Sequence, residues 1–148
     1  MYPWFVFLHV LGVFGFLMAH GVSVAVAFSL RRERNPERIR TLLNLSGSSI
    51  GFLNISIVIL LLTGIVAGFI GGWWSQGWIW LSLGLLIAIS VYMGVAASGH
   101  YGQVRKAVEL ASSEGIDALL NRSRPLQLAV AGFGSLAVIA WLMMFKPF

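Results

Sequence analysis

The sequence carries no Asp, Glu, Lys or Arg between Thr41 and Val104, and this charge-free stretch limits the fold more than any other feature. Two apolar blocks lie inside this stretch, a third precedes it and a fourth follows it. Each of the four is roughly 20 residues or longer, the length that spans a hydrocarbon core of about 30 Å. Soluble domains do not combine 58% hydrophobic with only 10% charged residues. The sequence therefore predicts an integral membrane protein.

We expect a single all-α membrane domain over residues 1–148, an antiparallel bundle of four transmembrane helices. The expected spans cover approximately residues 4–30, 49–70, 78–98 and 125–145. Asn35-Pro36 predicts the start of the second helix, which we expect to lie along the membrane surface before it enters near Ser49. Apolar residues at helical spacing over residues 103–121 predict a short interfacial helix between the third and fourth spans.

The distribution of basic residues predicts the orientation. Nine of the ten Lys and Arg residues belong to the first and third connections and the helix start after the first, and the tenth is Lys146. Because cytoplasmic loops carry the excess of basic residues, we expect a multi-pass protein of the cytoplasmic (inner) membrane with both termini outside the cytoplasm. The tryptophans fall at the predicted outer interface, where indole rings prefer to sit: Trp4, Trp73, Trp74, Trp78, Trp80 and Trp141.

Small residues recur at every fourth position in the apolar blocks. The first span has Gly15, Ala19, Ser23 and Ala27 at this spacing, and the second has the series that includes Gly64. Helices in lipid associate through close backbone approach, which small residues permit. The pattern predicts a compact bundle, and one such ridge is a candidate surface for a homodimer or a larger membrane complex.

Two histidines in the first span are the leading candidates for a binding site. His9 and His20 are eleven residues apart, so they share a helix face and are separated by roughly 16 Å along it. A histidine inside a membrane is costly and is usually functional or paired. Methionines match them in depth: Met93 lies near the level of His20, and Met143 and Met144 lie near the level of His9.

Imidazole and thioether both suit haem iron, so this set predicts a haem b site with His9 and His20 as ligands. No two histidines of one chain lie close enough to hold one haem between them. A methionine as the second ligand, a haem with one His ligand, and a two-fold dimer in which His9 meets its own copy are the open alternatives. The competing interpretation is structural: His20, Ser23, Asn54 and Tyr92 share one layer and would hydrogen-bond across helices. For His9 the competing interpretation is solvation or contact with headgroups.

The composition excludes several kinds of chemistry. The sequence has no Cys, which excludes disulfides, thiolate metal sites, Fe–S clusters and covalently attached c-type haem. The lack of acidic residues inside the spans argues against a proton pump or an ion-coupled transporter. The formal charge of +5 does not predict a nucleic-acid partner, because the basic residues flank the spans and suit anionic headgroups.

The segment Trp4-Phe5-Val6-Phe7-Leu8-His9-Val10-Leu11-Gly12 resembles the start of a class of four-helix bacterial membrane proteins. The class includes CopD-like proteins, their small relatives without an assigned reaction, and HemJ-type protoporphyrinogen oxidases. The resemblance implies the four-span fold and, through the HemJ type, haem at His9. The chain departs from the HemJ pattern, since residues 78–98 hold no basic residue and no Trp follows His9 closely. The oxidase activity is therefore not implied.

Three functions follow as hypotheses. The first is a haem b protein in electron transfer or redox chemistry, a candidate oxidoreductase whose partner is quinone if the rim of Trp73, Trp74 and Trp78 receives its ring. The second is a cofactor-free accessory subunit of a larger membrane complex. The third is a copper-handling membrane protein.

Overall fold

In the computed structural model, residues 1–110, 118–120 and 125–148 are described, with the backbone alone for residues 96–98 and 100. Four long helices make up most of this part of the chain. They are α1 (Tyr2–Arg32), α2 (Pro36–Gly71), α3 (Gly77–Glu109) and α5 (Pro125–Phe145), with the 3₁₀ turn η1 (Trp73–Ser75) after α2. Each helix contributes to a segment long and apolar enough to cross a membrane. The predicted all-helical, four-span fold is confirmed.

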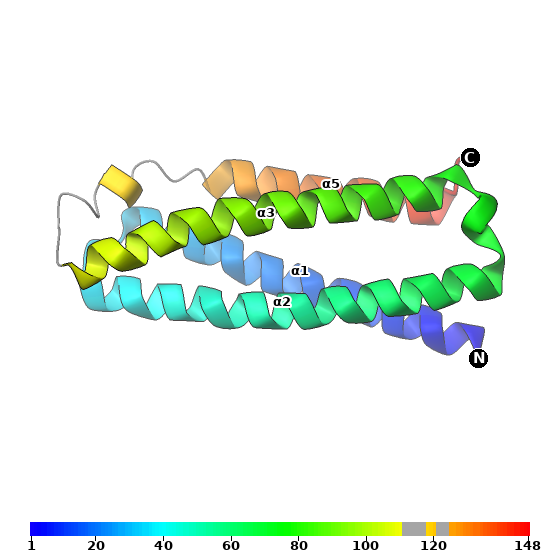
Figure 1. The fold of residues 1–148 in the computed structure, drawn as a ribbon, viewed down its shortest axis with the longest axis horizontal. Coiled ribbons are helices and arrows are strands. Elements are labelled where there is room, and N and C mark those ends of the chain that lie inside the picture. Colours follow the sequence, from blue (N-terminus) through cyan, green and yellow to red (C-terminus); the bar gives the residue numbers. More distant parts are fainter. Residues whose placement is uncertain (111–117, 121–124) are drawn as a thin grey trace.

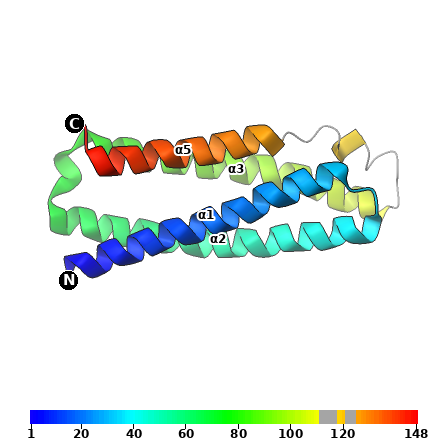
Figure 2. The same cartoon turned by 180° about the vertical axis from the view of Figure 1, so that it is seen from behind.

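The four helices form two antiparallel pairs. α1 packs along α2, and α3 packs along α5, whereas the two pairs contact each other more sparsely. α1 crosses α2 at an angle, so that its C-terminal half approaches the start of α5 (Figures 1 and 2). Both termini lie at the same end of the bundle as η1, as the predicted topology requires (Figure 1).

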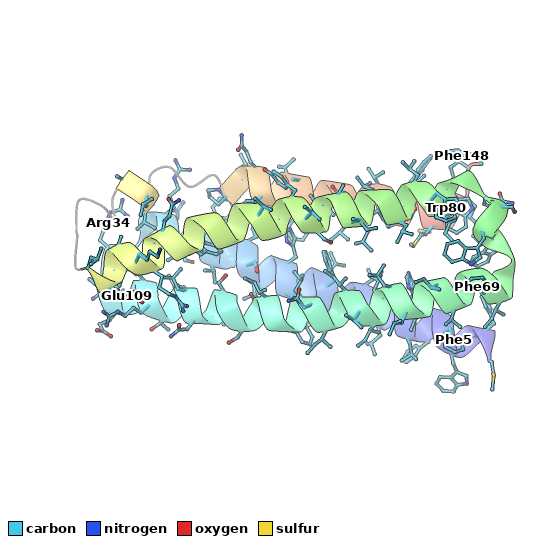
Figure 3. The ribbon with its side chains drawn as sticks, viewed as in Figure 1. Phe5, Arg34, Phe69, Trp80, Glu109 and Phe148 are labelled. Atoms are coloured by element: carbon cyan, nitrogen blue, oxygen red, sulfur yellow. The ribbon has the colours of Figure 1, made fainter. Side chains whose placement is uncertain are left out.

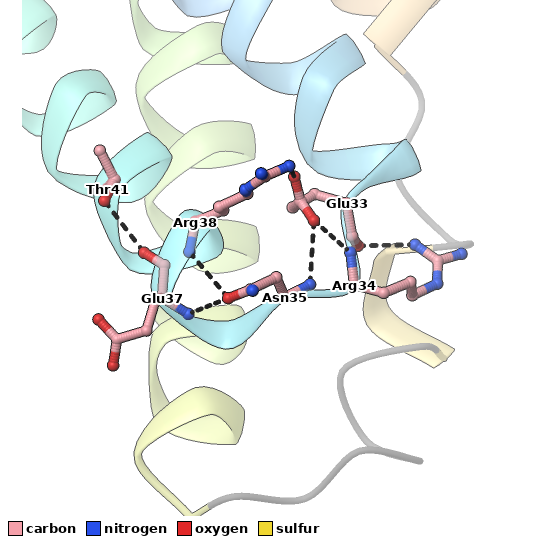
Figure 4. Close-up of polar contacts among 6 residues, drawn as sticks. All are labelled: Glu33, Arg34, Asn35, Glu37, Arg38 and Thr41. Carbon is pink, nitrogen blue, oxygen red and sulfur yellow. Dashed lines mark hydrogen bonds and ion pairs between the residues drawn. The ribbon is translucent and has the colours of Figure 1, made fainter.

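The connection between α1 and α2 is held by its own polar groups (Figure 4). The Asn35 side chain accepts hydrogen bonds from the backbone N–H groups of Glu37 at 2.9 Å and Arg38 at 3.4 Å, which caps α2 one residue before Pro36. The Glu33 carboxylate accepts from the N–H groups of Asn35 and Arg34 at 3.0 and 2.9 Å. These two N–H groups lower the pKa of Glu33. The predicted helix start at Asn35-Pro36 is confirmed.

A helix that first lies along the membrane surface has to change direction where it enters the membrane, and α2 has no break near Ser49, so this expectation was wrong. α2 is one helix from Pro36 to Gly71 and runs straight through the bundle (Figure 1). Its first turns carry Ile39 and Leu43, which are buried together with residues of α1 and α3. Burial of this apolar side inside the protein keeps the start of α2 in line with the rest of the helix.

A similar difference affects the expected interfacial helix. Residues 103–109 continue α3 without a break, because Val104 and Val108 are buried in the same inner cluster as Ile39. Residues 118–120 are helical, and Leu120 also belongs to this cluster. Most of the remainder of that expected helix lies outside the described residues.

The α1–α2 contact depends on small residues, as predicted. Ala19 and Ala27 are buried, and the Oγ atoms of Ser23 and Ser49 lie 3.0 Å apart across the two helices. A Cβ added to Gly15 would lie 2.6 Å from Oγ of Ser56, so a larger residue there would require Ser56 to move. These contacts confirm that α1 and α2 associate through close backbone approach.

Tryptophans and arginines lie at opposite ends of the bundle. Trp80 and Phe148 lie near the termini, whereas Arg34 lies at the other end (Figure 3). Lys146, the basic residue at the aromatic end, places its Nζ 3.9 Å from the ring centroid of Trp73. The separation of the two residue types is confirmed, and the side that faces the cytoplasm stays a prediction.

Candidate functional site

His20 lies in the interior, where α1, α3 and α5 meet. Its side chain is only 5% exposed. Its ring stacks on Phe16 of the same helix, with centroids 6.3 Å apart, and meets Phe133 of α5 edge-on at 4.7 Å. The two phenylalanines therefore form an aromatic wall around the imidazole.

Gly132 of α5 is the point toward which His20 is directed. A Cβ added to Gly132 would overlap Nε2 and Cε1 of His20, and it would lie 2.9 Å from Cε of Met93 on α3. The imidazole and the thioether side chain thus converge on one glycine. Any residue with a side chain at position 132 would displace one of them.

The Nε2 atom of His20 is buried and has no hydrogen-bond partner among the described residues. Leaving a buried polar group unpaired costs about 1–3 kcal/mol in proteins, and the hydrocarbon around a membrane bundle supplies no water to offset this cost. An imidazole nitrogen in such a position is a candidate ligand atom, because binding a metal centre would satisfy it.

His9 has different surroundings, in the contact between α1 and α2. Its Nδ1 lies 2.9 Å from the carbonyl oxygen of Leu60. Because a carbonyl only accepts, Nδ1 carries the proton, and in the neutral ring Nε2 keeps the lone pair. The ring fits against Gly64, where an added Cβ would lie 2.8 Å from Cε1 of His9. Thr63 Oγ1, at 3.4 Å from Nδ1, completes the polar contacts.

The structure separates the three methionines that depth alone grouped with the histidines. Met93 lies beside His20, as its depth indicated. Met143 is partly buried against the cluster that includes Leu60, whose carbonyl oxygen holds His9. Met144 is 78% exposed, so it points away from the bundle although it is next in sequence.

The expected hydrogen-bond network in the layer of His20 is not formed. Ser23 pairs with Ser49, Asn54 lies on the exposed surface of α2, and Tyr92 is 49% exposed on α3. Lying at the same depth in the membrane is not sufficient for a hydrogen bond, because these side chains leave their helices in different directions. The structural interpretation of His20 therefore loses the partners that would have supported it.

Metal-ligating residues are sparse in the described part of the chain. No three His, Cys, Asp or Glu side chains gather there as a metal-ion site would require. The donors that do converge are one imidazole and one thioether, a combination found on haem iron.

The aromatic rim is closely packed with its own side chains. Trp78 is 3% exposed, and its ring centroid lies 5.8 Å from that of Trp73. Trp74 has a buried Nε1 with no hydrogen-bond partner among the described residues. A quinone at this rim stays a prediction.

Two residues of the His20 site were not singled out from the sequence, namely Gly132 and Phe133. The available signal was the abundance of Gly and Ala in the first half of the fourth span. That signal indicates close packing but does not say which side chain the glycine receives.

Comparison with known proteins identifies the family and nothing more specific. Residues 4–147 match a family model described as "Predicted integral membrane protein (DUF2269)", so the chain belongs to the DUF2269 family. No curated protein matches it significantly. No solved structure matches it significantly either.

Proposed function

We propose that this DUF2269 protein binds b-type haem, which His20 and Met93 would hold, and that it transfers electrons within the membrane. The observation that carries the proposal is the buried Nε2 of His20, which lacks a hydrogen-bond partner in the described structure and faces Gly132. When bound, haem supplies reversible one-electron chemistry.

The residues around His20 suit such a group. Met93 brings a thioether side chain to the same point as the imidazole, and these two side chains fill the space over Gly132. Phe16 and Phe133 add apolar walls. An apolar site with one neutral nitrogen and one neutral sulfur donor holds iron without placing a charged side chain in the membrane.

His9 is the alternative ligand in this proposal. Its Nδ1–H bond to a backbone carbonyl is the orientation that many metal-bound histidines use, with Nε2 left for the metal. The resemblance of the N-terminal segment to CopD-like and HemJ-type proteins also favours His9. Its partner would be Met143 or the His9 of a second copy. The two histidines can be distinguished by mutation.

The test is the absorbance spectrum of detergent-purified protein produced with ample haem, first oxidised and then reduced with dithionite. We expect a Soret band and sharpened α and β bands on reduction. His20→Ala should abolish them, whereas His9→Ala should retain them. Met93→Ala should shift the spectrum and the reduction potential, with Met18→Ala as the control, since Met18 is 67% exposed. A flat spectrum of the unmodified protein would overturn the proposal.

A second candidate function is that of an accessory subunit, and Asn54 is the observation that favours it. Its amide lies on the exposed surface of α2, inside the segment that crosses the membrane. A polar amide facing lipid is costly, and helices in membranes satisfy such groups through a partner helix. In native membranes solubilised mildly, Asn54→Leu should then release the chain from a larger assembly, while Ile55→Leu should not.

A further inference from the structure

The end of the bundle that carries the arginines has a pocket between α2 and α3, and neither His9 nor His20 lines it. It is an open hollow of about 240 Å³, lined by Arg40, Leu43, Asn44, Arg105, Val108 and Glu109. We infer that it binds the headgroup phosphate of an anionic phospholipid. The inference does not depend on haem, since none of these residues contacts His9 or His20.

The depth of the pocket matches the lipid headgroups. Gly71 ends α2 at the aromatic side, and Arg40 is 31 residues earlier, which corresponds to about 46 Å along a helix. Arg105 follows Gly77 by 28 residues, about 42 Å. A bilayer including its headgroups is about 40–45 Å thick. Both arginines therefore lie at the level of the headgroups of the opposite leaflet.

The arginines are arranged to receive a phosphate. Nη2 of Arg105 donates to Oδ1 of Asn44 at 3.3 Å, which ties its guanidinium across to α2. This bond uses one of the five N–H donors of the guanidinium. Arg40 pairs with Glu37 at 3.7 Å, but both side chains are more than half exposed, so the pair is weak and Arg40 is free to turn. Planar guanidinium groups match phosphate oxygens in two-point contacts.

The surroundings also suit the rest of a lipid. Leu43 and Val108 are each 4% exposed and give the pocket an apolar floor. Toward the membrane, Gly47 and Gly102 have open space where a side chain would stand. An acyl chain that leaves the pocket therefore meets a helix surface that carries no side chain at these two positions.

The charge of the lining selects the class of lipid. Two arginines oppose one carboxylate, that of Glu109, which is exposed and therefore screened by water and salt. A phosphodiester with net charge −1 balances this excess. A zwitterionic headgroup does not, because its own ammonium group already compensates its phosphate.

The experiment measures lipid binding to the full-length protein by native mass spectrometry. Phosphatidylglycerol is titrated against phosphatidylethanolamine and phosphatidylcholine, and inorganic phosphate serves as the free-anion probe. We expect phosphatidylglycerol to bind most tightly. Arg40→Gln and Arg105→Gln should each weaken it about fivefold, and Glu109→Gln should strengthen it. Arg32→Gln is the matched control, since it removes the same charge from the same end of the bundle but does not line the pocket.

Each opposite result overturns the inference. Equal losses in Arg32→Gln and Arg105→Gln would mean that charge alone attracts the lipid. Equal binding of phosphatidylethanolamine would remove the selectivity for anionic lipid. Displacement of phosphatidylglycerol by inorganic phosphate at equal concentration would indicate a plain anion site. The melting temperature of each variant in neutral detergent shows that the bundle remains folded.

Discussion

His9 and His20 lie on the same helix, yet they differ in burial and in hydrogen bonding. His9 is half-buried, and its Nδ1 donates to the carbonyl oxygen of Leu60. His20 is almost fully buried, and its Nε2 has no partner in the described structure. The hydrogen bond of His9 accounts for its place in the fold without a ligand. The position of His20 is unfavourable unless something binds its Nε2, so the histidine without a hydrogen bond there is the stronger functional candidate.

A glycine lies against the ring of each histidine, but the two contacts join different pairs of helices. Gly64 lets α2 receive the ring of His9, and Gly132 lets α5 receive the ring of His20. The first contact belongs to the tightly packed α1–α2 pair. The second joins α1 to the α3–α5 pair, where contacts are sparser. The His20 contact is therefore one of a small number that hold the two pairs together.

The largest effect is expected at this contact. Gly132→Ala places a methyl group where the His20 ring lies, and such overpacking costs about 1–3 kcal/mol. Gly134→Ala is the matched control: it has open space and should be neutral or stabilising by up to about 1 kcal/mol. Unfolding by SDS titration would measure both. The double variant Gly132→Ala with His20→Ala should regain part of the loss, and strict additivity of the two changes would contradict the contact.

Replacement of each histidine by leucine sharpens the comparison in the haem-free protein. His20→Leu removes the unpaired nitrogen, a gain of about 1–3 kcal/mol that the lost ring contact with Phe133 reduces. His9→Leu removes a satisfied hydrogen bond and should destabilise by about 0.5–1.5 kcal/mol. The two changes should thus have opposite signs in the same unfolding assay. Equal destabilisation would show that His20 is as well satisfied as His9. With haem bound, His20→Leu should become the more harmful change.

The smallest effect concerns the connection that joins α1 to α2. The backbone N–H groups of Asn35 and Arg34 lower the pKa of Glu33 from its ordinary value of 4.5. The stabilisation is therefore present above pH 4.5 and is lost as the pH falls through the lower native value. A scan of melting temperature from neutral to acidic pH should show a small decline. The melting temperature of Glu33→Gln should fall less steeply with pH. If both proteins give the same curve, Glu33 does not cause the decline.

The sequence predicted much of this arrangement, because hydrocarbon leaves few alternatives. A long run without charge must be helical and must span the membrane, since only a helix satisfies its own backbone groups there. Depth follows from counting along a helix, so the level of Met93 beside His20 was also predictable. Asn35-Pro36 predicted the start of α2, because an N-cap depends only on residues that are neighbours in the sequence.

The sequence did not determine in which direction around the helix axis each side chain points. Ser23, Asn54 and Tyr92 share a depth with His20, but only the packed bundle shows that Asn54 and Tyr92 face outward. The same holds for Met144, which turns away although Met143 turns inward. Apolar residues surround each helix in a membrane, so periodicity does not reveal which side faces a neighbour. The pairing of helices decided that Gly132 receives His20, since this contact joins residues distant in sequence.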